Sequence, residues 1–255
     1  MDVPYEKAAA LLRESSCTIA VTGAGISVES GIPDFRSPTG IWSKYPPEHY
    51  ATIDAYLANP AKVWRFWKQL AIDFAECGPN PAHFALAALE RHGYLKAVVT
   101  QNIDALHQAA GSKTVIEYHG SARKLFCLDC SAVRPMDMQA MSDSPPRCHV
   151  CNGLMKPDIV MFGELIPQEA LRASAEWGDA CDAVLIVGTS AQVYPAADLP
   201  YLAKRNGAHI IEANIERTSF TETITDVFLK GPAGQTLPSL ARTLGLDVPG
   251  AHATG

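Results

Sequence analysis

The stretch Thr22-Gly-Ala-Gly-Ile-Ser-Val-Glu-Ser-Gly-Ile-Pro-Asp-Phe-Arg36 decides how the rest of the chain is interpreted. It follows residues 17–21, a short β-branched run that is typical of a buried strand. Gly23 and Gly25 let the backbone turn tightly and approach a phosphate with no Cβ in the way. A Gly-x-Gly pair after a strand is also common in plain turns. The stretch therefore predicts a strand and a candidate dinucleotide loop.

Two details of this stretch refine the prediction. Val28 stands where the fingerprint of hydride-transferring dinucleotide enzymes has a third glycine, which disfavours an NAD oxidoreductase. The polar end Asp34, Phe35 and Arg36 favours a loop that folds over a ligand. Residues 37–47, rich in Pro and Gly, are equally consistent with a surface loop and with a mobile lid.

Composition excludes several classes of protein. The chain has 255 residues, enough for one large domain or a large and a small one, and 47% of them are hydrophobic. Its net charge of -6 argues against direct binding of nucleic acid. No run approaches the roughly 18 apolar residues of a membrane span, and no signal peptide is visible. We therefore expect a cytoplasmic protein whose cysteines are metal ligands or free thiols.

The order of predicted elements alternates between strands and helices. Strands are expected at residues 17–21, 95–100, 115–119, 183–190 and 209–214. Helices are expected at residues 4–16, 61–76, 81–92 and 235–244. Residues 157–164 are expected to return the chain to the same sheet. This alternation predicts an α/β fold, a doubly wound parallel sheet with an inserted cysteine-containing module.

Polar side chains follow two of these strands. Asn102 and Asp104 come after the strand at 95–100, and His119 ends the strand at 115–119. The carboxyl ends of parallel strands are where open α/β sheets bind ligands, so these residues are candidates for a functional cleft. Helix capping explains Asn102 or Asp104 as well, and a lone histidine is more often structural. The residues alone leave both interpretations open.

Four cysteines carry the strongest chemical signal. Cys127 and Cys130 form one Cys-x-x-Cys pair, and seventeen residues later Cys148 and Cys151 form a second. This spacing predicts a tetrahedral zinc site, and two redox dithiols are the alternative. Four thiolates leave no open coordination position, so one structural zinc ion is expected in a module at about 122–157 that depends on it to fold.

Eight motifs in this order make the chain resemble the sirtuin family over about residues 5–245. They are Gly23–Ser27, Gly31–Arg36, Thr100–Asp104, His119-Gly120, the two cysteine pairs, Phe162-Gly-Glu164, Gly188–Ser190 and Asn214. The resemblance implies a Rossmann-like NAD-binding domain from residues 1–36, 77–121 and 158–250. It implies a cofactor lid and helical part of a small domain at 37–76, and a zinc-binding module at 122–157.

The resemblance also implies an activity. Sirtuins are NAD-dependent protein lysine deacylases that bind an acyl-lysine peptide between the two domains. They break the bond between nicotinamide and ribose and move ADP-ribose onto the acyl oxygen. The expected products are deacylated lysine, nicotinamide and O-acyl-ADP-ribose. The implied cofactors are NAD and zinc, and the implied partners are proteins or peptides that carry acyl-lysine.

Roles in the site follow from the same resemblance. It assigns the general base to His119, and it adds Asn102 and Asp104 to the catalytic set. The diphosphate would meet Ala24, Gly25 and the adjoining backbone, helped by Ser190. The NAD-binding residues that the resemblance implies are Gly23, Ala24, Gly25, Asp34, Phe35, Arg36, Gln101, Asn102, Ile103, Asp104, Gly188, Thr189, Ser190, Asn214, Ile215 and Ala233.

One departure from the family pattern concerns the acyl group. The substrate residues that the resemblance implies are Val160, Phe162, Gly163, Val193, Trp67 and Leu70. Trp67 and Leu70 stand where the branch that includes desuccinylases has a Tyr and an Arg to hold the acyl carboxylate. Neither side chain pairs with a carboxylate. We therefore expect weak desuccinylase activity and a preference for acetyl or longer apolar acyl groups.

Two other functions remain as alternatives. The same NAD chemistry would serve a protein mono-ADP-ribosyltransferase. A non-catalytic zinc-ribbon interaction module on a Rossmann scaffold is a second alternative, although Asn102, Asp104 and His119 together count against it.

Overall fold

A parallel sheet of six strands organises the larger part of the molecule in the computed structural model, which describes residues 3–137, 142 and 144–250. The strand order is β3-β2-β1-β7-β8-β9. The strands are β1 (Thr18–Thr22), β2 (Ala97–Thr100), β3 (Val115–Glu117), β7 (Ala183–Val187), β8 (His209–Asn214) and β9 (Val227–Lys230). The order reverses between β1 and β7, which is the point where such sheets bind ligands. The predicted doubly wound sheet is confirmed.

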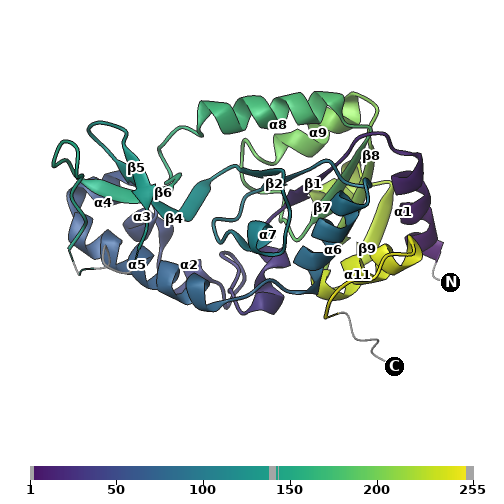
Figure 1. The fold of residues 1–255 in the computed structure, drawn as a ribbon, viewed down its shortest axis with the longest axis horizontal. Helices are drawn as coiled ribbons and strands as arrows, with labels where there is room; N and C mark the ends of the chain where they lie inside the picture. The colour runs from purple at the N-terminus through teal and green to yellow at the C-terminus, as the bar shows by residue number, and fades with distance from the viewer. Residues whose placement is uncertain (1–2, 138–141, 143, 251–255) are drawn as a thin grey trace.

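Helices cover both faces of this sheet (Figure 1). One face carries α1 (Val3–Glu14), α6 (Pro81–Arg91) and α11 (Ala233–Thr243), and the other carries α8 (Gln168–Ala180) and α9 (Asp198–Arg205). Two short helices, α7 (Leu106–Ala109) and α10 (Ser219–Thr223), follow β2 and β8. Within the described ranges, no helix is long and apolar enough to cross a membrane.

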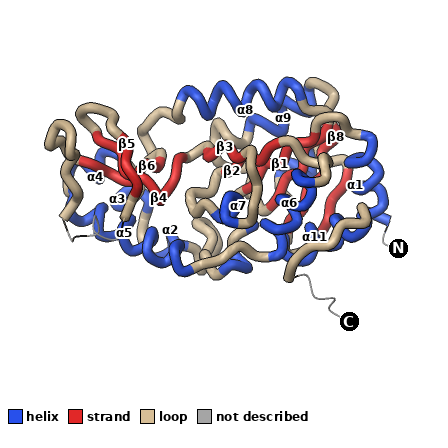
Figure 2. Tube along the Cα trace, in the orientation of Figure 1, coloured by secondary structure: helices blue, strands red, loops and turns tan. Residues whose placement is uncertain are grey.

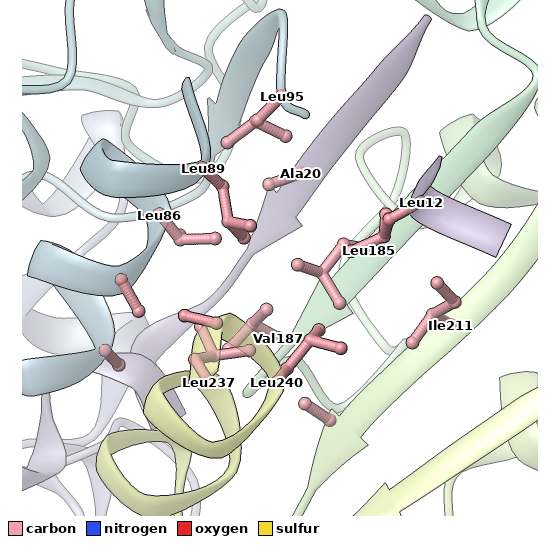
Figure 3. Close-up of a cluster of buried hydrophobic side chains, with 14 of the residues drawn as sticks. Leu12, Ala20, Leu86, Leu89, Leu95, Leu185, Val187, Ile211, Leu237 and Leu240 are labelled. Atoms are coloured by element: carbon pink, nitrogen blue, oxygen red, sulfur yellow. The ribbon is translucent and has the colours of Figure 1, made fainter. Parts of the chain in front are cut away.

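The core on the first face joins strands to all three of its helices. Ala20, Leu185 and Ile211 project from the sheet, and Leu89 and Leu240 meet them from α6 and α11 (Figure 3). Each fully buried leucine contributes about 2 kcal/mol of hydrophobic stabilisation. Because successive strand residues point to opposite faces, and both faces are covered, the central strands β1 and β7 are buried at every position, and β7 is apolar throughout.

Local signals fix the start of α6 as predicted. The Asn80 side-chain oxygen accepts the N–H of Ala82 at 2.9 Å, and the backbone N–H of Asn80 donates to Nδ1 of His83 at 3.3 Å. Pro81 occupies the first helical position, where no N–H partner is needed. This double cap satisfies donors that the helix itself leaves unpaired.

A second, smaller sheet lies beside the first and is antiparallel (Figure 2). Its order is β5-β4-β6, with β4 (Gly120–Cys127), β5 (Val133–Pro135) and β6 (Met155–Ile159). The expectation that residues 157–164 rejoin the parallel sheet is wrong, because β6 pairs with β4 instead. The sequence of a strand does not by itself show which other strand it pairs with. Gly120, at a φ of +77°, has no Cβ to collide with the Asp158 carbonyl, so β4 and β6 approach closely.

Four helices pack against this smaller sheet. They are α2 (Ile41–Lys44), α3 (Pro47–Tyr50), α4 (Ile53–Ala58) and α5 (Pro60–Glu76). The helix predicted at 61–76 is α5, and it buries Val63, Trp64, Phe66, Trp67, Ala71 and Phe74. Trp64 also donates from its Nε1 to the Ser142 carbonyl at 2.9 Å. The Tyr56 hydroxyl donates to the Met155 carbonyl at 2.5 Å, which ties α4 to β6. The smaller part thus has a core of its own.

Candidate active site

A cavity of about 820 Å³ lies between the two sheets. On one side it is lined by loops at the carboxyl ends of β1, β2, β7 and β8. On the other side it is lined by α5 and by the segment that follows β6. This is the crevice that the strand order predicts for a ligand.

Most of the predicted site residues line this cavity. They are Gly23, Ala24, Gly25, Asp34, Phe35, Arg36, Trp67, Gln101, Asn102, Ile103, His119, Val160, Phe162, Gly163, Gly188, Thr189, Ser190, Val193, Asn214 and Ile215. Asp104, Leu70 and Ala233 are not among the lining residues. Leu70 lines a second cavity of about 350 Å³ with Arg65 and Phe66. Ala233 is buried in the core at the start of α11.

The loops after β1 and β7 touch each other through glycines. The N–H of Gly25 donates to the Gly188 carbonyl at 2.8 Å. A Cβ on Gly25 would lie 2.7 Å from the Gly188 Cα, so any side chain there pushes the loops apart. The glycines therefore serve loop packing as well as the close approach of a phosphate.

Thr189 joins these loops to the neighbouring strands. The Gln101 amide nitrogen donates to its Oγ1 at 3.0 Å, and the Asn214 amide nitrogen donates to its carbonyl at 3.0 Å. The polar ends of β2, β7 and β8 thus form one connected floor for the cavity.

The segment after Gly31 folds across one side of the cavity. Oδ1 of Asp34 accepts the N–H groups of Arg36 at 2.8 Å and Ser37 at 2.7 Å. The rings of Phe35 and Trp42 pack with centroids 5.1 Å apart. Phe35, Arg36, Ser37 and Trp42 all line the cavity, so this stretch covers the site and is not a remote surface loop.

His119 is oriented by the loop after β2. Its Nδ1 lies 3.1 Å from the Gln101 carbonyl oxygen, which can only accept, so we assign the proton to Nδ1. Nε2 is then the free basic nitrogen. Burial lowers the pKa of His119 below its ordinary value, and the Arg36 charge adds to this, while the bond to Gln101 opposes it. The ring is therefore neutral near pH 7 and able to accept a proton.

Asp104 lies beneath the cavity wall. Its Oδ2 accepts the Ser27 hydroxyl at 2.7 Å, and its Oδ1 accepts the Leu106 N–H at 2.9 Å. Burial raises the pKa of the Asp104 carboxyl, and these two hydrogen bonds oppose the rise. Ser27 also accepts the Asn102 amide at 3.1 Å, so Asp104 holds Asn102 indirectly.

Two members of this buried cluster were not predicted. Ser27 lies in the first glycine motif, and its hydroxyl next to the glycines was the one signal that could have indicated a polar contact. His83 lies 3.5 Å from the Ser27 hydroxyl, and its ring packs against His107 with centroids 5.0 Å apart. A histidine within a predicted helix does not by itself predict a contact with a loop serine or with another histidine. Lining residues such as Trp42, Gln192, Arg217 and Glu222 were also missed, because the loops and short helices that carry them have no regular apolar pattern.

The four cysteines come together as predicted. One Sγ atom from each of Cys127, Cys130, Cys148 and Cys151 lies within 4.8 Å of the other three. All are free thiols, and the N–H groups of Val150 and Gly153 donate to two of the sulfurs. One cluster of four fits a tetrahedral zinc ion better than two separate redox dithiols. None of the four lines the cavity, which fits a structural ion.

Comparison with known sequences gives consistent matches. Residues 23–195 match the family model described as Sir2 family. NAD-dependent protein deacylase 2 of Pyrobaculum aerophilum is 47% identical over 230 residues, which are 90% of this chain and 92% of that protein. The NAD-dependent protein deacylase of Pyrococcus furiosus is 46% identical over 239 residues, 92% of this chain and 95% of that protein.

Solved structures agree with the sequence matches. A Sir2 homologue in complex with NAD has a TM-score of 0.90 at 40% identity, covering 96% of this chain and 94% of its own. A Sir2 protein with a deacetylated p53 peptide and 3'-O-acetyl-ADP-ribose has a TM-score of 0.88 at 37% identity, covering 95% and 99%.

Proposed function

Because the chain belongs to the Sir2 family, we propose that it removes acyl groups from lysine side chains of proteins in a reaction that consumes NAD. The observation that carries this proposal is that His119, half-buried and with its Nδ1 3.1 Å from the Gln101 carbonyl oxygen, lies on the same cavity as the two glycine loops. NAD supplies the ADP-ribose group that accepts the acyl group when nicotinamide leaves.

The loops at the strand ends bind NAD in this proposal. The backbone of Gly23, Ala24 and Gly25 takes the diphosphate, with help from Gly188, Thr189 and Ser190. Gln101 and Asn102 hold one ribose, and Asn214 and Ile215 hold the other. The connected floor through Thr189 supports this assignment, because it fixes the donors of Gln101 and Asn214 before the ligand binds.

His119 acts as the general base on a ribose hydroxyl. The proton at Nδ1 is held by the Gln101 carbonyl, which leaves Nε2 to accept the hydroxyl proton. Ile103 lines the nicotinamide end, where Asn102 is oriented by Ser27. Asp104 contributes to that end through Ser27, since its carboxylate already accepts two hydrogen bonds.

The segment of Asp34, Phe35 and Arg36 excludes water from the reacting centre. Phe35 shields the ribose carbon at which the bond to nicotinamide breaks, since water there would give hydrolysis in place of transfer. The Asp34 carboxylate supports this role by folding the segment, because it accepts two backbone N–H groups within it.

The acyl-lysine enters between the two sheets. Val160, Phe162, Gly163 and Val193 border it, and the peptide adds as an extended strand. The acyl end is apolar, formed by Trp67 with Phe35, Trp42, Ile103 and Met161. Acetyl or longer apolar acyl groups therefore fit better than succinyl. In the same proposal, Leu70 of α5 belongs to the residues that set the acyl preference.

The remaining parts of the proposal concern organisation and location. We divide the chain into an NAD-binding domain (1–36, 77–121, 158–250), a lid and helical part (37–76) and a zinc module (122–157), in which the ion is structural. We place the protein in the cytoplasm, in line with its seven cysteines, none of which forms a disulfide. Direct binding of nucleic acid is not part of its function, in line with the net charge of -6.

One assay tests the reaction. The zinc-loaded protein is incubated with NAD and an acetyl-lysine peptide, and products are identified by mass spectrometry. We expect deacetylated peptide, nicotinamide and O-acetyl-ADP-ribose in equal amounts. ADP-ribose attached to the peptide or protein, from labelled NAD and without deacetylation, would support the mono-ADP-ribosyltransferase alternative. No turnover with acetyl, succinyl or long-chain acyl peptides would support the non-catalytic alternative.

A further inference from the structure

Lys156 is a charged residue inside the smaller part of the molecule. It belongs to β6, and its side chain is only 5% exposed. Its Nζ donates to the carbonyl of Ile159 at 2.6 Å and lies 3.0 Å from Oε2 of Glu164. A third bond goes to the Pro157 carbonyl at 3.3 Å. A buried ammonium is costly without such partners, so its position is tightly determined.

Glu164 closes the segment that follows β6. The same Oε2 accepts the N–H of Met161 at 2.8 Å, and the N–H of Glu164 donates to the Met161 carbonyl at 3.0 Å. Residues 161–164 therefore form a turn held by both backbone and carboxylate. Lys156 ties this turn to the end of β6 through Ile159.

The segment held in this way connects the candidate base with the peptide site. The N–H of Val160 donates to the His119 carbonyl at 2.9 Å. Phe162 exchanges two backbone bonds with the chain near α3 and α4, to Ala51 at 2.8 Å and from Ile53 at 3.0 Å. A shift of the segment would therefore move the peptide site relative to His119.

Part of this segment remains open to a partner. Within the described part of the chain, the Val160 carbonyl and the Gly163 N–H have no hydrogen-bond partner. Both residues line the cavity. Such groups at the edge of a cleft are those that an added peptide strand uses.

We propose that the Lys156–Glu164 ion pair positions this edge and thereby sets the affinity of the enzyme for acyl-lysine peptides. The inference rests on the proposed deacylase function and names the residues that shape its peptide site. Both are positioning residues, because the hydrogen bonds and the ion pair of their side chains stay within residues 156–164, although Glu164 also lines the cavity. The NAD loops belong to the other sheet and make none of these bonds, so NAD binding is independent of the pair.

The test compares Lys156→Met, Glu164→Gln and the conservative Lys156→Arg with the wild-type protein. Affinity for a fluorescent acetyl-lysine peptide is measured by anisotropy, and KM is measured separately for peptide and NAD. We expect Lys156→Met and Glu164→Gln to weaken peptide binding and raise peptide KM by about 10- to 100-fold, as small displacements of a site do. KM for NAD stays within about twofold of wild type. Lys156→Arg keeps the charge and restores most of the peptide affinity.

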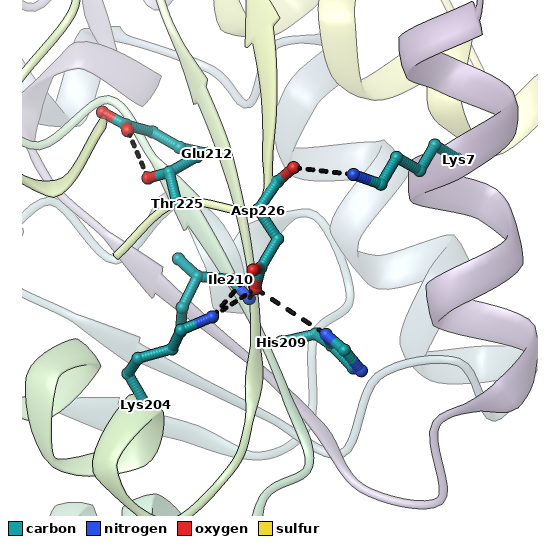
Figure 4. Close-up of polar contacts among 7 residues, drawn as sticks. All are labelled: Lys7, Lys204, His209, Ile210, Glu212, Thr225 and Asp226. Atoms are coloured by element: carbon teal, nitrogen blue, oxygen red, sulfur yellow. Dashed lines mark hydrogen bonds and ion pairs between the residues drawn. The ribbon is translucent and has the colours of Figure 1, made fainter. Parts of the chain in front are cut away.

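Asp226→Asn is the matched control for a lost ion pair. The Asp226 carboxylate also accepts a hydrogen bond from the Lys204 ammonium at 2.7 Å and one from the backbone N–H of Ile210 at 2.8 Å (Figure 4). Asp226 directly precedes β9 and does not line the cavity, so this variant should lower the melting temperature and leave peptide affinity unchanged.

Three outcomes would overturn the inference. One is unchanged peptide affinity in folded Glu164→Gln, which carries the test alone if Lys156→Met does not fold. Another is an equal rise of both KM values, as a general loss of structure would give. The third is a wild-type protein that binds no acyl-lysine peptide. That result would overturn the proposed function as well, whereas the first two outcomes would overturn only the role of the ion pair.

Discussion

The Nδ1 atom of His119 lies 3.1 Å from the carbonyl oxygen of Gln101. The two residues come from neighbouring strand ends, so the parallel pairing of β2 with β3 brings them together. Gln101 also reaches Thr189 with its side chain. The orientation of the candidate base is therefore coupled to the floor of the NAD site, and chemistry and cofactor binding share one rigid connection.

The pH dependence of the reaction follows from this environment. Burial and the Arg36 charge lower the pKa of His119 below its ordinary value of about 6.5. The base therefore remains neutral at pH 6.5 and becomes protonated only at lower pH. Activity therefore remains at its plateau at pH 7 and falls only at more acidic pH. The measurement is kcat/KM for an acetyl-lysine peptide between pH 5 and pH 9. Arg36→Gln removes the charge and should move the acidic limb to higher pH. An acidic limb at or above pH 6.5 in wild type would contradict the assignment.

Acid should destabilise the fold through two buried histidines. Burial lowers the pKa of His83 to about 4 and that of His107 to about 3, while both titrate near 6.5 when unfolded. The unfolded chain then binds more protons below pH 6.5, so stability is complete above that pH and is lost as pH falls toward 4. Each histidine should account for about 2 kcal/mol of lost stability at pH 5.

Urea unfolding of wild type and His107→Asn at pH 7 and pH 5 measures this effect. The variant has no ring to protonate, so it should lose about 2 kcal/mol less than wild type between the two pH values. Equal losses in both proteins would show that His107 does not stay neutral in the fold.

Zinc removal should unfold the smaller sheet. The four thiols join the end of β4 to the loop before β6, and a structural zinc ion contributes on the order of 10 kcal/mol to such a module. Metal analysis should find one zinc ion per chain, and Cys148→Ser should lose both the ion and hydrogen-exchange protection in β4 and β6. Cys17→Ser, outside the cluster, is the control and should keep both. Full protection in metal-free protein would refute a structural role.

Acyl preference depends on the apolar end of the cavity. Trp67 lines this end, and Leu70 lies one turn further along α5 and lines the second cavity. Neither side chain pairs with a succinyl carboxylate, so succinyl turnover should be at least about tenfold below acetyl turnover. Both peptides are assayed at one concentration. Trp67→Tyr combined with Leu70→Arg should raise the succinyl rate relative to the acetyl rate, and Leu70→Met should not. Comparable succinyl and acetyl turnover in the wild-type protein would contradict this prediction.

Features with a local cause were predictable from the sequence. The strand before Gly23 is recognisable because both of its faces are buried, and its residues are therefore apolar or β-branched at every position. The cap at Asn80 and the two cysteine pairs depend on short spacings that survive in any tertiary context. The sheet followed from the alternation of such elements.

Features that depend on distant partners were not predictable. Residues 157–159 have the composition of a sheet strand, but β4 pairs with them antiparallel in another sheet. Asp104 and Asn102 both bond Ser27, but the turn before α7 keeps the Asp104 side chain out of the cavity lining, which its spacing from Asn102 does not reveal. Lys156 carries no sequence signal, because its partners at 159 and 164 become neighbours only when the chain turns after β6.

The central claim is that His119 catalyses NAD cleavage coupled to an acyl-lysine peptide. The most direct measurement is nicotinamide release from NAD with and without an acetyl-lysine peptide, for wild type, His119→Ala and the exposed control His92→Ala. We predict peptide-dependent release in wild type and His92→Ala, and a loss of about 100-fold or more in His119→Ala. Release that persists in folded His119→Ala, or that ignores the peptide in wild type, would contradict the account.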